Sequence, residues 1–275
     1  MHNSQSTVQL SDGRAIPQIG LGVWQASDAE ARSAVKTALE EGYRHVDTAS
    51  IYGNEKGVGE GIRASGALRD QLFLTTKVWN DAHGFDAATQ ALDASLSRLK
   101  VDYVDMLLIH WPVPSQDNFV ETWRALIEAQ RIGKAKSIGV SNFNADQLER
   151  LIVETGVAPV LNQIELHPFM QQQELRRIHQ KMQISTQAWS PLGQGSALTD
   201  PVVLDIARKY NRTAAQVIIR WHIELGNIAI PKSITPARIK ENFHVFDFSL
   251  DARDISAIGT MNSGNRLGPD PSTFG

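Results

Sequence analysis

The sequence of 275 residues contains no cysteine. This absence excludes a disulfide framework, a thiol nucleophile and any cysteine-ligated zinc or iron–sulfur site. The sequence also has no long apolar run, and its N-terminal segment is too polar for a signal peptide. We therefore expect a cytoplasmic protein that does not enter a membrane.

An excess of charge of one sign is missing as well. The chain carries 27 Lys and Arg against 30 Asp and Glu, a formal net charge of −3. Such a balance leaves no basic surface for nucleic acid or for an anionic membrane. We expect the partner to be a small molecule and the protein to be a monomer.

Several motifs of phosphate, metal and nucleophile sites are absent. Without GxGxxG or GxxxxGK[ST], any dinucleotide must bind without a Rossmann unit or a P-loop. Without HxH or HExxH, a metal-dependent barrel hydrolase has no support, and we expect no metal. The segment Gly139-Val-Ser141-Asn-Phe143 lacks the final glycine of GxSxG, which argues against a serine-nucleophile hydrolase.

The chain does contain a regular alternation of short apolar runs and amphipathic stretches. Runs rich in Ile, Leu and Val that are bounded by polar or turn residues predict strands. Helical spacing and cap residues predict helices between them, among others over 27–41, 86–100 and 144–155. The predicted strands cover 19–21, 45–47, 72–76, 103–109, 135–139, 160–163, 184–188 and 228–230.

Strands that alternate with helices form a parallel sheet. Eight such units, at intervals of about 30 residues, predict a single-domain α/β protein, a (β/α)8 TIM barrel over residues 1–275. A doubly wound open sheet has the same periodicity and remains an alternative. Residues 8–10 and 15–18 flank a glycine turn and predict an N-terminal β-hairpin that plugs the barrel. Residues 261–275 have no periodicity and predict a C-terminal tail over the active-site face.

Four chemically active side chains follow three consecutive predicted strands, at the ends where a barrel carries its chemistry. They are Asp47, Tyr52, Lys77 and His110. A nearby ammonium stabilises a phenolate, and a buried carboxylate keeps that ammonium charged. Tyr52 would thereby donate a proton to a developing alkoxide, and a neutral His110 would orient the carbonyl oxygen. Alone, Asp47 or Lys77 is more typical of a structural ion pair. Tyr52 alone could be a rim aromatic and His110 a core histidine, so only the set of four indicates catalysis.

A candidate phosphate site lies near the end of the chain, where a strand, a short loop and a helix follow one another. Thr235 is a plausible N-cap, and Pro236 suits the first helical position. The free N–H groups of a helix start attract anions. Lys232 and Arg238 add positive charge there. The alternative is a capped surface helix with solvated charges.

Six separated motifs resemble the aldo-keto reductase family, in the order of that family. They are YRHVDTASIYGNEKGVGEGI, LTTKVWN, LLIHWP, IGVSNF, NQIELHP and IPKSITPARIKENF, and the resemblance extends from Leu21 to Phe246. WSPLGQG and RLGPDP resemble its bacterial branch of 2,5-diketo-D-gluconate reductases. The resemblance implies a (β/α)8 barrel that reduces aldehydes and ketones with NADPH, without metal or flavin. It also implies that Tyr52 is the general acid, that Asp47 and Lys77 tune it, and that His110 orients the carbonyl.

The resemblance also implies a cofactor site built from many strand ends. Ser141, Asn142 and Gln163 match contacts to the nicotinamide carboxamide, Trp189 matches the aromatic that stacks on the ring, and residues 190–195 match the loop over the pyrophosphate. Lys232, Ser233 and Arg238 match the 2′-phosphate grip, while Glu241 and Asn242 match adenine contacts. The implied cofactor residues are Gly22, Val23, Trp24, Asp47, Ser141, Asn142, Gln163, Trp189, Ser190, Pro191, Leu192, Gly193, Gln194, Gly195, Lys232, Ser233, Ile234, Thr235, Arg238, Glu241 and Asn242.

The implied substrate pocket is aromatic: Trp24, Trp79 and Trp111 join Tyr52 and His110. Aromatic walls with few polar groups accept varied carbonyls, so 2,5-diketo-D-gluconate, methylglyoxal and β-keto esters all remain open.

Two other functions are weaker interpretations. An NADPH-binding sensor or auxiliary subunit with little turnover would be typical of a degraded set of catalytic residues, whereas all four are present here. A barrel hydrolase that uses Asp47 and Glu165 leaves Lys77 and the phosphate site unexplained, and Glu165 is better interpreted as a structural residue at a strand end.

Overall fold

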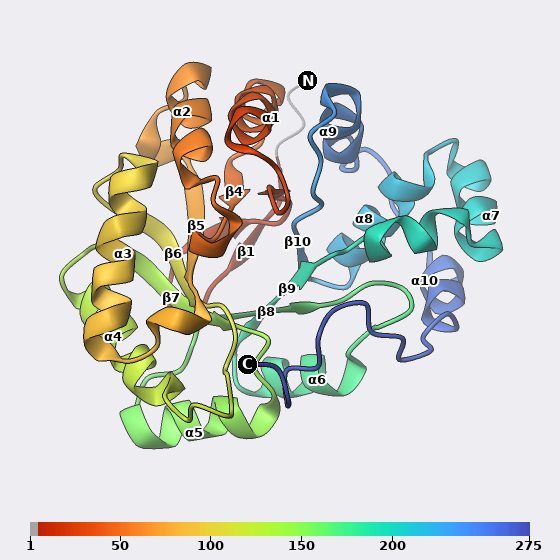
Figure 1. The fold of residues 1–275 in the computed structure, drawn as a ribbon. Coiled ribbons are helices and arrows are strands. Elements are labelled where there is room, and N and C mark those ends of the chain that lie inside the picture. The colour runs from red at the N-terminus through yellow and green to blue at the C-terminus, as the bar shows by residue number, and fades with distance from the viewer. Residues whose placement is uncertain (1–4) are drawn as a thin grey trace.

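Eight short strands pair in parallel and follow one another around the sheet in chain order (Figure 1). The computed structural model describes residues 5–275. Each strand overlaps one of the eight apolar runs that predict strands. The strands are β3 (Leu21–Gly22), β4 (His45–Asp47), β5 (Phe73–Val78), β6 (Val104–Ile109), β7 (Ala135–Ser141), β8 (Leu161–Glu165), β9 (Ser185–Trp189) and β10 (Ile228–Ala229).

The barrel closes between its first and last strands. Ile19 forms a parallel bridge with Ala229, and Gly22 forms another with Lys232. A Cβ atom on Gly22 would lie 2.9 Å from the carbonyl oxygen of Ile230, so glycine lets the two segments approach this closely. Closure confirms the predicted (β/α)8 barrel and removes the doubly wound open sheet as an alternative.

Helices surround the barrel, and the predicted cap residues begin and end them (Figure 1). Ser27 and Asn144 each accept a hydrogen bond from the backbone of the third helical residue, while Gly42 and Gly156 end the same helices with φ of 110° and 72°. The helices are α1 (Asp28–Glu41), α2 (Glu55–Ser65), α3 (Phe85–Leu99), α4 (Phe119–Arg131), α5 (Ala145–Thr155), α6 (Gln173–Lys181), α7 (Pro201–Tyr210), α8 (Ala214–Glu224), α9 (Pro236–Phe243) and α10 (Ala252–Gly259). Within residues 5–275, none combines the length and the apolarity that crossing a membrane requires.

The predicted N-terminal hairpin is present. Strands β1 (Thr7–Gln9) and β2 (Ala15–Pro17) pair antiparallel. Ile16 of the hairpin is fully buried in a cluster with Phe73, Met106 and Ile228. Because Phe73 and Ile228 are the first residues of β5 and β10, the hairpin covers the end of the barrel where the strands begin.

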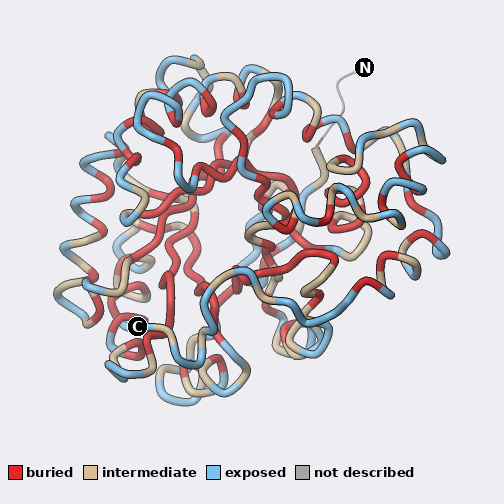
Figure 2. The backbone as a smooth tube through the Cα atoms, turned by 45° about the vertical axis from the view of Figure 1, so that its right-hand side comes forward, coloured by how far each residue is buried: buried red, intermediate tan, exposed pale blue. Residues whose placement is uncertain are grey.

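The barrel strands are buried almost throughout, as the red tube in Figure 2 shows, but part of their interior is polar. His45, Asp47, Lys77, Gln163 and Gln187 are all at most 2% exposed. Barrel interiors are usually filled by branched apolar side chains, and buried polar groups require hydrogen-bond partners. The polar interior therefore marks the part of the fold where chemistry is expected.

Buried histidines make the fold sensitive to acid. Burial lowers the pKa of His45 and His179 to about 4 and that of His222 to about 3. Below the ordinary value of 6.5 the unfolded chain binds protons that the folded chain does not, so the folded state loses stability as the pH falls from 6.5 toward 4. We expect the free energy of unfolding to decrease by roughly 1.4 kcal/mol per pH unit for each such histidine.

Urea unfolding between pH 7.5 and pH 5 measures this dependence. His179→Gln serves as the control, because it removes one of these titrating groups and should flatten the slope. A free energy of unfolding that stays constant over this range would contradict the prediction.

Candidate active site

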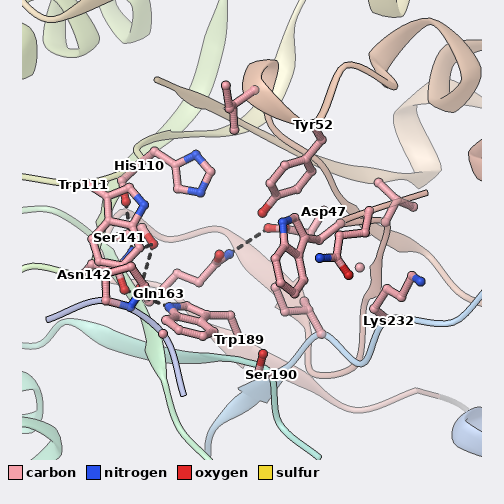
Figure 3. Close-up of a pocket in the computed structure, with 18 of the residues that line it drawn as sticks. Asp47, Tyr52, His110, Trp111, Ser141, Asn142, Gln163, Trp189, Ser190 and Lys232 are labelled. Atoms are coloured by element: carbon pink, nitrogen blue, oxygen red, sulfur yellow. Dashed lines mark hydrogen bonds between the residues drawn. The ribbon is translucent and has the colours of Figure 1, made fainter. Parts of the chain in front are cut away.

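A cavity of about 520 Å³ opens at the carboxyl ends of the strands (Figure 3). Three of the four predicted catalytic residues line it, together with all of the predicted aromatic walls and about half of the predicted cofactor residues. Those that line it are Gly22, Val23, Trp24, Asp47, Tyr52, Trp79, His110, Trp111, Ser141, Asn142, Gln163, Trp189, Ser190, Gln194 and Lys232.

Lys77 lies beneath the cavity and contacts both Asp47 and Tyr52. Its side chain is fully buried, and Nζ donates hydrogen bonds to Asp47 Oδ1 at 2.5 Å and to the Thr48 carbonyl at 2.9 Å. Tyr52 Oη lies 3.5 Å from the same nitrogen. Burial alone would lower the pKa of Lys77, but the charge of Asp47 and the contact with Tyr52 raise it above its ordinary value. Lys77 is therefore a charged ammonium held against the phenol.

Local structure explains how these side chains meet. Strands β4 and β5 are neighbours, with Asp47 opposite Thr75, so Asp47 and Lys77 project from adjacent strands. A short 3-10 turn over Ser50–Tyr52 follows β4 and carries Tyr52 back over the barrel. Ser50 Oγ donates to the carbonyl of Lys77 at 3.0 Å and attaches this turn to β5.

The balance of effects on Tyr52 differs from the sequence-based expectation. Lys77 does lower the pKa of the phenol, as expected, but burial raises it more, and Asp47 adds to the increase. The net pKa lies above the ordinary value of 10. Tyr52 therefore keeps its proton at neutral pH and is present in the form that an acid must have.

His110 lies beside Tyr52 and faces the same space (Figure 3). Its ring centroid is 5.7 Å from that of Tyr52 and 5.0 Å from that of Trp79, with both contacts edge to face. Burial first and Lys77 second lower the pKa of His110 well below 6.5, so the imidazole is neutral, as predicted. No residue between 5 and 275 forms a hydrogen bond to its buried Nδ1 atom.

A network of amides joins the strand ends beside His110. Asn142 Nδ2 donates to the carbonyl of His110 and to Ser141 Oγ, each at 3.0 Å. Trp189 Nε1 donates to Asn142 Oδ1 at 2.8 Å, which fixes the orientation of the indole. Asn142 has a φ of 65°, a strained backbone conformation of the kind that gathers at functional sites.

The loop after β9 has an unusual backbone. Ser190, Gly193, Gln194 and Gly195 have φ values of 46°, 59°, 51° and 96°. Ser190 and Gln194 reach the cavity, whereas the predicted cofactor residues Pro191, Leu192, Gly193 and Gly195 do not line it.

The predicted phosphate segment has the expected helix start. Thr235 is the N-cap residue of α9 and Pro236 its first residue, although the Thr235 hydroxyl makes no capping hydrogen bond. Lys232 lines the cavity, and Arg238 has neither an ion pair nor a side-chain hydrogen bond with any other residue from 5 to 275. Glu241 accepts a hydrogen bond from Thr213 at 2.8 Å. The predicted residues outside the cavity lining on this segment are Ser233, Ile234, Thr235, Arg238, Glu241 and Asn242.

The C-terminal tail forms one wall of the cavity, through residues that the sequence did not predict. The tail was expected over this face, but its lining residues Leu267, Gly268, Pro269 and Phe274 were not identified. Phe274 packs on Trp111 with ring centroids 4.6 Å apart. The tail sequence has no periodicity, so nothing in it indicates which side chains turn inward. Gln25 and Ile51 also line the cavity without having been predicted.

Glu165 holds this tail in place. The residue is fully buried at the end of β8, and its oxygens accept hydrogen bonds from the backbone of Leu267 at 2.6 Å and of Gly268 at 3.0 Å. A Cβ atom on Gly268 would lie 2.5 Å from the Trp189 ring, so the tail contacts this indole closely. His167 donates to the same carboxylate at 3.0 Å. The structure therefore supports a structural role for Glu165 rather than that of a hydrolytic base.

Comparisons with known proteins agree with the barrel fold and assign it to a family. A model of the aldo/keto reductase family matches residues 18–263. Methylglyoxal reductase DkgA of Escherichia coli is 50% identical over 272 residues, with 98% of each chain covered. An aldo/keto reductase structure from Brucella melitensis is 59% identical, with a TM-score of 0.92 over 94% of this chain and 100% of that chain. The structure of a mutant of Gox0644 in complex with NADPH is 48% identical, with a TM-score of 0.95 over 99% of both chains.

Proposed function

Because the chain belongs to the aldo-keto reductase family, we propose that it reduces aldehydes and ketones to alcohols with NADPH and that Tyr52 is the general acid. One observation carries the proposal. The phenol of Tyr52 projects into an aromatic cavity while the buried Lys77–Asp47 ion pair lies directly behind it.

The polar groups of the cavity fit a nicotinamide. Gln163 lines the cavity, and its Oε1 accepts no hydrogen bond from residues 5–275, so an acceptor is available for a carboxamide. In the proposed complex Ser141, Asn142 and Gln163 hold the carboxamide and Trp189 stacks on the ring. A bound NADPH would supply the hydride that reduces the carbonyl carbon.

The residues of the chain supply the proton and orient the substrate. Tyr52 Oη donates its proton to the carbonyl oxygen as negative charge develops there. Lys77 stabilises the phenolate that remains, and Asp47 keeps Lys77 charged. His110, which is neutral, orients the carbonyl oxygen by hydrogen bonding.

Lys232 and Arg238 are proposed to bind the 2′-phosphate that distinguishes NADPH from NADH. Arg238→Ala is expected to weaken NADPH binding by roughly 10- to 100-fold, since a hydrogen bond to a charged group contributes about 1.5–3 kcal/mol. Binding of NADH should change little. Titration of both cofactors measures the two dissociation constants. Lys240→Ala removes a charge from the same helix and should leave both constants unchanged, whereas equal losses for NADPH and NADH in Arg238→Ala would refute this assignment.

The aromatic walls suggest a site for small carbonyl compounds rather than for one closely recognised substrate. Trp24 stands at the mouth with 44% of its surface exposed, and Trp79 and Trp111 lie farther in. The relative named methylglyoxal reductase supports methylglyoxal as a substrate, beside 2,5-diketo-D-gluconate and β-keto esters.

The test is NADPH oxidation by the purified protein with each of these three carbonyl classes, compared by kcat/KM. We expect carbonyl-dependent loss of NADPH absorbance with at least one class. A protein that binds NADPH tightly but oxidises it with none of them would instead fit the sensor function.

A further inference from the structure

A chain of buried polar side chains extends from Asp47 through the barrel interior toward the N-terminal hairpin. Gln163 Nε2 donates to Asp47 Oδ2 at 2.7 Å and to Gln187 Oε1 at 2.8 Å. Gln187 Nε2 lies 3.4 Å from His45 Nε2, and His45 Nδ1 lies 3.3 Å from the carbonyl oxygen of Pro17. Gln187 and His45 are fully buried, and neither takes part in the reaction as proposed above.

Strand register brings these side chains together. Gln163 and Gln187 are direct partners across β8 and β9, so their side chains lie on the same face of the sheet. His45 and Asp47 are two residues apart on β4 and share a face as well. All four side chains project into the barrel, and Asp47 and His45 belong to two successive layers of its interior.

The donors and acceptors along this chain have a single consistent arrangement. The carbonyl of Pro17 only accepts, so His45 Nδ1 carries the hydrogen and, in a neutral ring, His45 Nε2 is an acceptor. Gln187 therefore donates to His45 and turns its Oε1 toward Gln163. The Asp47 carboxylate pairs with Lys77 and only accepts, so it takes one N–H of Gln163 while Gln187 Oε1 takes the other. Both N–H groups are thus directed away from the cavity, and Gln163 Oε1 is left for a ligand.

We propose that Gln187 is a positioning residue that acts through Gln163: as the second acceptor beside Asp47, it holds the plane of the Gln163 amide so that the carbonyl oxygen, rather than the NH2 group, faces the nicotinamide carboxamide. This inference rests on the proposed function. Without Gln187 the bond to Asp47 Oδ2 still holds the Gln163 nitrogen, but the second N–H has no buried acceptor. The amide plane can then turn about the remaining bond, and Oε1 leaves the position that faces the carboxamide. The site would then lose its preference for a cofactor that carries an N–H donor at that position.

The test compares the binding of NADP+ with that of its 3-acetylpyridine analogue, in which a methyl group replaces the amide NH2. Titration of tryptophan fluorescence reports binding without turnover, since Trp111 and Trp189 line the cavity. The wild-type protein is expected to prefer NADP+ roughly tenfold, the effect of one hydrogen bond. In Gln187→Met, which keeps length and removes both polar atoms, the preference should fall to near onefold while both compounds still bind.

Four further variants separate positioning from general damage. Gln163→Met should abolish the preference to the same extent, and the double variant Gln163→Met/Gln187→Met should lose nothing more, because Gln187 acts through Gln163. Thr186→Val alters the neighbouring residue of β9, whose hydroxyl bonds His179 instead, and should keep the tenfold preference. His45→Leu removes the acceptor that orients Gln187 and should reduce the preference for NADP+ severalfold. It tests the role of Gln187 if Gln187→Met does not fold.

If Gln187→Met keeps the wild-type preference for NADP+ over the analogue, the inference is overturned. If Gln187→Met does not fold, an unchanged preference in His45→Leu overturns it. Equal binding of the two compounds to the wild-type protein overturns it as well, because Gln163 Oε1 would then not contact the amide. If neither compound binds to the wild-type protein, the proposed function itself fails, and this result is distinct from the other two.

Discussion

Replacing Tyr52 by phenylalanine is expected to lower kcat for carbonyl reduction by roughly 10²- to 10⁴-fold, the usual contribution of a positioned general acid. The substitution removes one hydroxyl, which lies 3.5 Å from Lys77 Nζ, and leaves the ring against His110. Because the hydroxyl donates its proton to the substrate, we expect the dissociation constant of NADPH to change little. Steady-state kinetics and an NADPH titration on the same preparation measure both quantities.

Tyr43→Phe is the matched control for this prediction. Tyr43 is also buried, but its hydroxyl donates to the carbonyl of Ile239 at 3.0 Å and the residue does not line the cavity. Its loss should cost about 1 kcal/mol of stability and leave kcat unchanged. Full activity in Tyr52→Phe, or loss of its NADPH binding, would show that another group is the acid.

Lys77→Met is expected to impair both catalysis and stability. Nζ is the partner of Asp47 at 2.5 Å, and both side chains are at most 2% exposed. Removing one member of a buried ion pair leaves an uncompensated charge, so the free energy of unfolding should fall by about 3–5 kcal/mol. The phenolate of Tyr52 also loses its stabilising cation, and we expect kcat to fall by roughly 10²-fold or more.

A double variant separates these two effects. Lys77→Met/Asp47→Asn removes both charges of this pair, and its asparagine oxygen still accepts from Gln163 Nε2. It should recover most of the lost stability in a urea unfolding experiment while it remains inactive. The interpretation of the ion pair would be wrong if Lys77→Met unfolded at the same urea concentration as the wild-type protein.

The local pattern of the chain predicted the secondary structure well, and it predicted that four side chains now proposed as catalytic lie together. Apolar runs and cap residues such as Ser27 and Gly42 specify elements through contacts within one helix or strand, which the sequence displays directly. Parallel strands place their carboxyl ends at the same end of the barrel. Strand order alone therefore predicted that Asp47, Lys77 and His110 lie close together. The structure brings these three together with Tyr52 as predicted.

Other features could not be predicted, because they depend on contacts between distant segments. Two of the tail residues that line the cavity, Leu267 and Gly268, are held by Glu165, which lies 102 positions before Leu267. The direction of the pKa shift of Tyr52 depends on how far burial outweighs Lys77, and burial is a property of the assembled barrel.

The sequence by itself therefore determined the eight-unit barrel, its hairpin and the four side chains proposed to carry out the reaction, because local periodicity and strand-end position are enough for these. Tertiary structure alone decided the orientation of the Gln163 amide, whose nitrogen contacts Asp47 from 116 positions away. The same holds for the tail that walls the cavity. Both depend on hydrogen bonds that exist only when the barrel has closed and excluded water, since an exposed amide or carboxylate would bond to solvent instead.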